Sequence, residues 1–556
     1  MGRLYKEYVI ETLDAEGNVA HVSFRKDPDY NFGYDIVDRI ARENPDKLAM
    51  VWCNEAGEEK FITFREMKEE SDRTASYFRS LGIKKGDAVM LILRRHYEFW
   101  YCIVALHKIG AIAIPATNQL MTKDIVYRVN AASVKAIVCT SDGHISELVD
   151  EAQKETETLK IKILVRGRRE GWLSYEDGIR QAPPFTPPVG DERPKAEEIM
   201  LMYFSSGTTG LPKMVAHNHY YSLAHIPTAV YWHNVNPDGL HFTVSETGWG
   251  KAVWGKIYGQ WIAEAAIFTF DFEKFHADEL LKRISKYRVT TFCAPPTIYR
   301  FLIKEDLSKY DLSSLEYCTT AGEALNPEVF KRFKEQTGIE IKEGFGQTET
   351  TLVIATTLWM KPRPGSMGRP SPQYSVDLVD ENGNSVSPGE VGEIVLRIEP
   401  ERPTGLMIEY YRSPEMTAQA IRDGLYHTGD TAWRDEDDYY YYVGRTDDII
   451  KSSGYRIGPF EVESVIMEHP AVLECAVTGV PDPLRGQVVK ATIVLARGYQ
   501  PSDALAKEIQ EYVKKNTAPY KYPRIIEFVE ELPKTISGKI RRTEIRKRDL
   551  ERDVNN

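Results

Sequence analysis

The chain has 556 residues, of which 42% are hydrophobic and 28% are charged, and its formal net charge is −11. This length exceeds the usual size of one domain, so we expect more than one domain, with cores that need no disulfide support. The acidic balance repels a phosphate backbone and excludes nucleic acid as a main partner.

The six cysteines are scattered, and none forms a C-x-x-C pair or lies near a histidine at a metal-ligand spacing. We therefore expect reduced, mostly buried thiols. The first twenty residues are charged throughout and lack an apolar signal region, which predicts a cytoplasmic protein. The most apolar stretch, residues 99–116, is interrupted by charged residues and a proline, so we expect no membrane-spanning segment. A homo-oligomer remains open.

The first part of the chain alternates amphipathic helical patterns with short apolar runs. Residues 64–81 have helical spacing, whereas the runs at 88–93, 111–115 and 135–140 are typical of buried strands. A proline-rich connection leads to another apolar strand at 199–204. This alternation predicts an α/β architecture with parallel sheets.

Later segments continue this pattern and then change character. The runs 290–296 and 315–325 each place an apolar strand before a Gly or Pro loop. After Gly365, a small β-rich module is expected, with strands at 375–380, 381–390 and 391–398. From Ile449 we expect an α+β domain; its helices are 459–468 and 501–515, and its strands are 472–480, 488–495 and 524–528. The predicted domains are therefore residues 1–446 and a small domain of residues 447–556.

The strongest chemical signal is Y-F-S-S-G-T-T-G-L-P-K at 203–213, directly after a strand. Its glycines allow close approach of the backbone to a polyphosphate, and its hydroxyls and terminal lysine can bind the oxygens. The phosphate-binding residues are Ser205, Ser206, Gly207, Thr208, Thr209 and Lys213. A Ser/Thr-rich surface turn is the weaker alternative. The spacing is not that of a Walker loop, which disfavours kinase chemistry.

Four further motifs follow in order: G-F-G-Q-T-E-T at 344–350, Y-H-T-G-D at 426–430, G-R-T-D-D-I-I-K-S-S-G-Y-R-I-G at 444–458 and P-K-T-I-S-G-K-I-R-R at 533–542. Together with the phosphate-binding loop, they resemble the adenylate-forming superfamily over essentially the whole chain. This superfamily contains acyl-CoA synthetases, firefly-type luciferases and peptide-synthetase adenylation domains. The strings at 452–459, 481–491 and 518–524 are similar to those of medium-chain acyl-CoA synthetases.

The resemblance implies roles that the chemistry of carboxylate activation also requires, because two anions must be brought together. Lys539, Thr348 and Glu349 would be catalytic, with Glu349 binding Mg²⁺. Asp430 and Arg445 would hold the ribose. Taken alone, such acids could be solvated loop charges or helix caps. The remaining nucleotide-binding residues would be Gly322, Glu323, Ala324, Glu343, Gly344, Phe345, Gly346 and Gln347.

Residues 247–261 contain three tryptophans, which usually indicates core packing on a helix. The resemblance instead implies an acyl pocket, with Trp254 shortening it to suit a short, branched or single-ring acid. Its members would be Trp249, Gly250, Lys251, Trp254, Cys293 and Gly346. Coenzyme A would contact Ser453, Gly454, Arg456, Arg485 and, more weakly, Lys514. Asp447 would be the hinge between the domains.

The predicted function is an AMP-forming carboxylate–CoA ligase that uses ATP and coenzyme A as co-substrates. It would activate a short- or medium-chain, branched or aromatic carboxylate to an acyl-AMP intermediate and then to the CoA thioester. A luciferase would share the first step but not the CoA surface. A peptide-synthetase module is disfavoured because no carrier-domain serine motif follows Arg542. A non-catalytic nucleotide-binding protein would be expected to lose Lys539 or Glu349. A kinase would release ADP rather than AMP.

Overall fold

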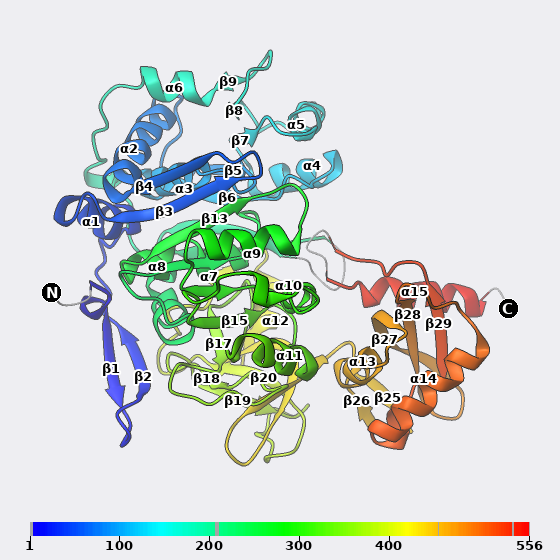
Figure 1. Ribbon diagram of the computed structural model, residues 1–556. Helices are drawn as coiled ribbons and strands as arrows, with labels where there is room; N and C mark the ends of the chain where they lie inside the picture. Colours follow the sequence, from blue (N-terminus) through cyan, green and yellow to red (C-terminus); the bar gives the residue numbers. More distant parts are fainter. Residues whose placement is uncertain (1–3, 206–210, 454, 536–538, 555–556) are drawn as a thin grey trace.

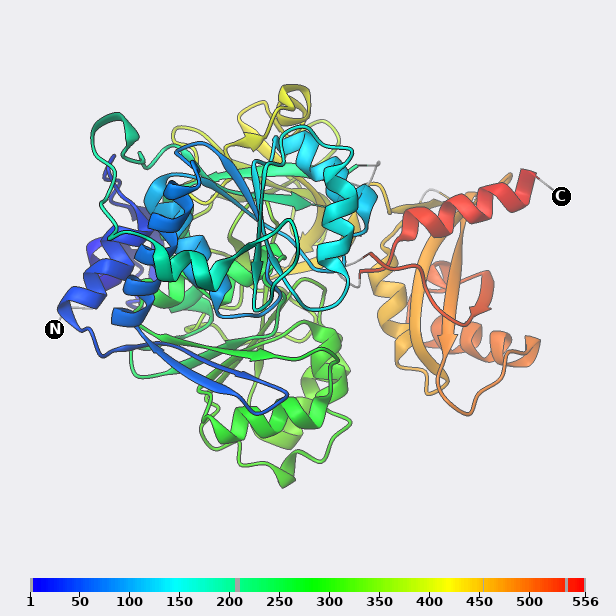
Figure 2. The same ribbon diagram turned by 90° about the horizontal axis from the view of Figure 1, so that it is seen from above.

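A computed structural model describes residues 4–205, 211–453, 455–535 and 539–554. A large body contains most of the chain, and a smaller carboxyl-terminal body stands beside it in both views (Figures 1 and 2). This arrangement confirms the predicted α/β class with a large and a small domain. All six cysteines are buried and unpaired, as predicted. Among the described residues, no helix is long and apolar enough to cross a bilayer.

The first large sheet has the strand order β21-β11-β10-β6-β5-β7-β8-β9 and is parallel from β10 to β9. Every residue of β5 is buried, as expected for a strand covered on both faces by helices. Its strands are β5 (Ala88–Ile92), β6 (Ile112–Pro115), β7 (Ala136–Thr140), β8 (Ile161–Val165), β9 (Leu173–Ser174), β10 (Ile199–Ser205), β11 (Lys213–Asn218) and β21 (Glu409–Tyr410). The accompanying helices are α2 (Phe64–Ser80), α3 (Glu98–Ile109), α4 (Thr122–Ala132), α5 (Ile145–Gln153) and α6 (Tyr175–Gln181).

The second sheet has nine strands in the order β18-β17-β16-β15-β14-β12-β13-β3-β4. Its central strands β16, β15, β14, β12, β13 and β3 are parallel, so their carboxyl ends share one edge. The strands are β3 (Leu48–Asn54), β4 (Glu59–Thr63), β12 (Leu240–Thr243), β13 (Ala266–Asp271), β14 (Thr291–Cys293), β15 (Tyr317–Ala321), β16 (Ile341–Gly346), β17 (Leu352–Ala355) and β18 (Arg369–Pro370). The helices of this part are α7 (Gly250–Gly255), α8 (Tyr258–Ile262), α9 (Ala277–Lys286), α10 (Pro296–Leu302) and α11 (Pro327–Thr337).

The β-rich module is a five-stranded antiparallel sheet. It comprises β19 (Val376–Val379), β20 (Gly392–Arg397), β22 (Ile421–Arg422), β23 (Leu425–Arg434) and β24 (Tyr440–Arg445). The strand predicted at 381–390 is wrong, because this segment forms turns and loop. The Asp380 carboxylate accepts the backbone N–H groups of Asn382 and Asn384 at 2.9 and 2.8 Å, a local alternative to sheet pairing.

The carboxyl-terminal body has its own five-stranded sheet and buried core. Helix α14 begins at Asp503 because the Ser502 hydroxyl accepts the N–H of Leu505 at 3.2 Å and caps it. The elements are β25 (Ile450–Ser452), β26 (Tyr455–Ile457), α13 (Pro459–Met467), β27 (Val472–Asp482), β28 (Gly486–Leu495), α14 (Asp503–Asn516), β29 (Ile525–Val529) and α15 (Arg542–Val554). The chain changes sheets between Arg445 and Ile450, the interval that contains the predicted boundary at 447.

Candidate active site

The edge formed by the carboxyl ends of β14, β15 and β16 gathers several predicted site residues. These strands end at Cys293, Ala321 and Gly346, and neighbouring strands run parallel. Crevices at such edges are the common ligand sites of open α/β sheets. One predicted adenine wall, residues 322–324, is the loop that follows β15. The other, residues 343–345, lies on the adjacent strand β16.

The adenine walls are tightly packed. Gly322 has φ +103°, a conformation that favours glycine. The buried Glu343 carboxylate accepts the N–H of Leu325 at 3.2 Å, and burial raises its pKa to about 8. A Cβ on Gly344 would lie 2.6 Å from the Trp232 ring, so only glycine fits there. Trp232 therefore packs against Gly344 of β16, a contact that the sequence analysis did not predict.

A hydrogen-bond network joins the predicted ribose residues. The Asp430 carboxylate accepts from the Gln347 amide at 2.5 Å, the Tyr442 hydroxyl at 3.0 Å and Arg445 at 3.3 Å. The Tyr426 hydroxyl donates to Gln347 Oε1 at 2.7 Å. Burial raises the pKa of Asp430, while Arg445, Gln347 and Tyr442 oppose the shift. Tyr426 and Tyr442 were not predicted as site residues.

Two of the predicted phosphate-binding residues, Ser205 and Lys213, lie opposite each other on the antiparallel strands β10 and β11. Ser206, Gly207, Thr208 and Thr209 lie outside the described residues. The Lys213 ammonium lies 4.8 Å from the Tyr410 ring centroid, and the Tyr410 hydroxyl donates to Glu349 Oε1 at 2.9 Å. One tyrosine therefore contacts both the predicted phosphate cation and the predicted metal carboxylate.

A buried histidine supports the catalytic segment. His217 Nε2–H donates to the carbonyl of Thr348 at 2.8 Å. Burial lowers the pKa of His217 to about 4, so its ring is neutral at physiological pH. The sequence offered no signal for this contact, because a histidine within an apolar strand is usually an ordinary core residue.

The start of α7 meets the nucleotide segments. A Cβ on Gly250 would lie 3.5 Å from Thr348 Oγ1, and the Lys251 ammonium donates to the carbonyl of Ala321 at 2.7 Å. The Trp254 ring packs against Gly346, where a Cβ would lie 2.4 Å from it. Trp249 precedes α7 as its cap residue, and Cys293 is buried at the end of β14.

The three tryptophans of this segment do not share one helix. Trp261 lies on α8 in the core, and its Nε1–H donates to the carbonyl of Ala49 at 2.9 Å. Trp254 lies on α7 against the nucleotide strand. Both side chains are buried in the same core, but only Trp254 packs against a predicted nucleotide residue.

Lys539 belongs to the carboxyl-terminal body, but its charge affects the pKa values of two residues in the large domain. Burial lowers the pKa of Lys251, Cys293 and Glu323 oppose this shift, and the charge of Lys539 adds the smallest lowering. The same charge opposes the burial-driven rise in the pKa of Asp430. The backbone around Lys539 is held by the N–H of Thr535, which donates to its carbonyl at 2.7 Å. The charge of the predicted catalytic lysine therefore influences one predicted acyl residue and one predicted ribose residue.

The predicted CoA contacts fall into two groups. The N–H of Ser453 donates to the carbonyl of Arg485 at 2.9 Å, and Arg456 lies on the neighbouring β26. Arg456 forms an ion pair with Glu381 of the large domain. Gly454 lies outside the described residues. Lys514 is on α14, where it pairs with Glu511 and lies 4.4 Å from the Tyr522 ring centroid, so no described contact joins it to the others.

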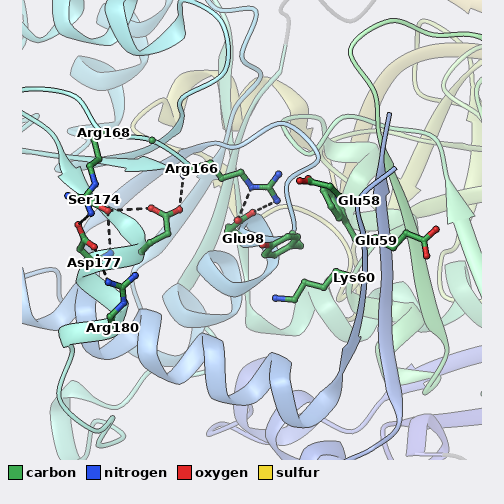
Figure 3. A pocket seen from close by; sticks show the side chains of 13 residues that line it. Glu58, Glu59, Lys60, Glu98, Arg166, Arg168, Ser174, Asp177 and Arg180 are labelled. Carbon is green, nitrogen blue, oxygen red and sulfur yellow. Dashed lines mark hydrogen bonds and ion pairs between the residues drawn. The ribbon is translucent and has the colours of Figure 1, made fainter. Parts of the chain in front are cut away.

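A separate cavity of about 700 Å³ lies between the β3–β4 hairpin and α6 (Figure 3). Its charged side chains are paired with one another or with neighbours: Arg166 with Glu98 at 2.9 Å and Arg168 with Asp177 at 2.7 Å. The Lys60 ammonium likewise lies 2.9 Å from Glu66. None of the predicted site residues lines it, so it is distinct from the candidate active site.

Comparison with protein families gives a match to the AMP-binding enzyme model over residues 37–411 and to the AMP-binding enzyme C-terminal domain over residues 461–539. The chain belongs to the AMP-binding enzyme family. This membership confirms the resemblance to adenylate-forming enzymes. The predicted residue roles and the boundary at 447 stay predictions.

Members of this family with similar sequences include the mouse mitochondrial acyl-coenzyme A synthetase ACSM3, 41% identical over 98% of this chain and 96% of the relative. The human mitochondrial acyl-coenzyme A synthetase ACSM5 is 42% identical over 94% of this chain and 91% of its own length. Both relatives are mitochondrial proteins, which contradicts the expectation of a cytoplasmic protein. That expectation rested on the charge and hydropathy of the first twenty residues, which do not specify a compartment.

Solved structures of the family match along nearly the whole chain. An anthranilate CoA ligase, AuaEII, in complex with anthranoyl-AMP has a TM-score of 0.87 and 31% identity, covering 95% of this chain and 99% of that structure. A benzoate CoA ligase from Burkholderia xenovorans has a TM-score of 0.80 and 27% identity, covering 93% of this chain and 100% of that structure.

Proposed function

We propose that this chain converts a compact carboxylic acid, ATP and coenzyme A into an acyl-CoA, AMP and pyrophosphate. The chain is an AMP-forming acyl-CoA synthetase, an acid–thiol ligase, as the sequence predicted and its family relatives support. The finer assignment concerns the acid: short, branched or single-ring rather than a long fatty chain.

The proposal rests on direct contacts between the predicted acyl segment and the predicted nucleotide segments. Gly250 and Thr348 are neighbours, Trp254 packs on Gly346, and Lys251 binds the strand end that precedes the adenine wall. A carboxylate held beside Lys251 would therefore lie next to the phosphates of a bound ATP. This is the proximity that attack on the α-phosphorus requires.

In the first step the carboxylate oxygen attacks the α-phosphorus, and pyrophosphate leaves with its bonding electrons. Lys539 would bring the two anions together and stabilise the charge of the transition state. Asp430 and Arg445 would hold the ribose, and Thr348 would bind the α-phosphate. In the second step the thiol of coenzyme A attacks the acyl carbon, and AMP leaves.

Glu349 fits a magnesium ion bound mainly by phosphates. One of its oxygens accepts the Tyr410 hydroxyl, and no described residue donates to the other. Mg²⁺ typically uses one or two carboxylates together with nucleotide phosphates and water. The described residues contain no cluster of three or more metal-ligating side chains. They therefore form no metal site made of protein ligands alone. We propose that Mg²⁺ binds with ATP, where it neutralises phosphate charge.

The thioester step would need a different face of the small domain. Ser453, Gly454, Arg456 and Arg485 would bind coenzyme A, with Lys514 as a weaker candidate, and Asp447 would permit rotation. Arg456 is engaged with Glu381 here, so rotation would have to release that ion pair. An exposed ion pair is weak enough to allow this.

Pyrophosphate exchange tests the proposal with acetate, butyrate, 2-methylbutyrate, octanoate, benzoate and phenylacetate. The expected result is acid-dependent exchange, greater for compact acids than for octanoate, with AMP and acyl-CoA formed after addition of coenzyme A. Formation of ADP, or exchange without any acid requirement, would contradict the assignment.

A further inference from the structure

Next to Trp254 lies a group of buried polar side chains with unused hydrogen-bonding atoms. They are both ring nitrogens of His225, Nε1 of Trp232, Nε2 of His233 and Oε1 of Gln260. All four side chains are completely or almost completely buried. No described residue bonds these atoms. Buried polar atoms are usually paired, so a ligand with complementary hydrogen-bonding groups would stabilise this group.

Three of these side chains neighbour the predicted acyl residue Trp254, and the fourth is bonded to one of them. The Trp254 ring centroid lies 6.2 Å from that of His225 and 6.4 Å from that of Trp232. The Gln260 amide donates to the carbonyl of Trp254 at 3.1 Å and to Nδ1 of His233 at 3.2 Å. The charge of Lys251 also contributes to the lowered pKa of His233, after burial and His241. The group therefore adjoins Trp254, a predicted acyl-pocket residue.

The hydrogen-bond pattern shows which of the unused atoms are donors and which are acceptors. Because Gln260 Nε2 donates to His233 Nδ1, the proton of a neutral His233 is on Nε2, which is a donor. Trp232 Nε1 is another donor, and Gln260 Oε1 is an acceptor. Burial lowers the pKa of His225 far below its ordinary value, so its neutral ring offers one donor and one acceptor.

We infer that the inner acyl pocket selects an acid bearing a neutral hydroxyl or amino group, and that His225 is the residue that recognises this group. This inference rests on the proposed function, since it takes the acyl group to lie beside Trp254. A hydroxyl or amino group can both donate and accept, matching the mixed set of unused atoms. A purely aliphatic tail would leave them unpaired, and a second carboxylate would find no cation in this group.

The test compares acids that differ only by hydroxyl for methyl. The pairs are 3-hydroxybutyrate with 3-methylbutyrate, and hydroxybenzoate with methylbenzoate at each ring position. Pyrophosphate exchange gives kcat/KM for each acid with the natural protein, His225→Phe and His225→Gln. His219→Phe is the matched control: His219 is equally buried, with both nitrogens unused, but its ring neighbour is His107 rather than Trp254.

In at least one pair, the natural protein should favour the hydroxy acid by about tenfold or more, as expected for one buried hydrogen bond. His225→Phe should remove that preference through loss on the hydroxy acid, with the methyl acid changed less than about twofold. His225→Gln should retain part of it, and His219→Phe all of it.

The inference is overturned if the natural protein favours the methyl acid, or neither acid, in every pair; the unused atoms would then bind water only. It is equally overturned if His225→Phe keeps the hydroxy preference. Absence of acid-dependent exchange with any acid would instead contradict the proposed function. Circular dichroism verifies folding of each variant, and the comparison of acids on the natural protein needs no variant.

Discussion

Arg542 donates from Nη2 to both carboxylate oxygens of Glu463, each at 2.7 Å. Glu463 also accepts the N–H of Val477 at 2.8 Å. The pair joins the start of α15 to α13 and β27, three residues after Lys539. The position of the predicted catalytic lysine therefore depends on an ion pair in the interior of the small domain.

Arg542→Ala should destabilise the small domain by about 3–5 kcal/mol, because it leaves the buried Glu463 charge without its partner. Urea unfolding followed by fluorescence and circular dichroism measures the free energy of unfolding. The double variant Glu463→Leu, Arg542→Leu should recover much of the loss, since two apolar groups leave no uncompensated charge. A loss below about 1 kcal/mol in the single variant would show that the pair has no such role.

Glu343 should make stability fall with rising pH. Burial raises its folded-state pKa from 4.5 to about 8, so between these values the folded protein retains a proton that the unfolded chain releases. Its contribution is present below the unfolded pKa and is lost as pH rises through the folded pKa. Glu343→Gln should remove this dependence, which is at most about 1.4 kcal/mol per pH unit.

Urea unfolding at pH 5, 6.5 and 8 compares Glu343→Gln with the natural protein. The stability of the variant relative to the natural protein should increase with pH. A constant difference between the two proteins across this range would mean that Glu343 does not titrate as its burial implies.

Trp254→Gly should shift activity towards longer acids, because it removes an indole that packs on Gly346 at the predicted end of the acyl pocket. Each additional methylene that becomes buried can contribute up to about 0.8 kcal/mol to binding. Pyrophosphate exchange with C4 to C10 acids provides the measurement. An unchanged chain-length profile in a folded variant would identify Trp254 as a core residue only.

Asp447→Pro should impair the thioester step more than adenylation. Asp447 lies where the chain passes between two sheets, and proline fixes φ and restricts rotation there. Its neighbour Asp448 is already joined to Arg546 of α15, so it moves with the small domain. The half-reactions are measured separately, with Asp447→Ala as the flexible control. Equal loss of both half-reactions would argue against a hinge at this residue.

The sequence predicted the buried strands well because their apolar runs are continuous. The expected strand at 88–93 is β5, and the expected helix at 64–81 is α2, which the Thr63 side chain caps. The expected strand at 381–390 failed because the Asp380 turn satisfies the backbone locally, which hydrophobic pattern does not reveal.

The motifs identified residues that are far apart in sequence but meet in the fold, such as Gln347 with Asp430 and Lys251 with the end of β15. They did not identify His217, Trp232, His225 or Tyr442. These residues lie outside the short signatures used as site assignments, and their importance depends on three-dimensional packing. A single histidine or tyrosine in an apolar segment has the same pattern whether it supports a site or fills a core.

The charge of Lys539 affects the pKa values of Lys251 and Asp430, although Lys539 belongs to the small domain. Lys539→Ala should therefore lose adenylation by about a hundredfold or more, because one preorganised charge is removed from the transition state. The thioester step should continue near the natural rate, since it does not require this cation. Lys534→Ala is the control: this lysine is on the same segment but pairs with Glu474 at 2.8 Å within the small domain.

The most direct measurement is single-turnover kinetics of each half-reaction with Lys539→Ala, starting either from ATP and acid or from supplied acyl-AMP and coenzyme A. We expect acyl-AMP formation to fall about a hundredfold or more, while conversion of supplied acyl-AMP to acyl-CoA stays close to the natural rate. Intact adenylation, or equal collapse of both half-reactions in a folded variant, would contradict the role of Lys539.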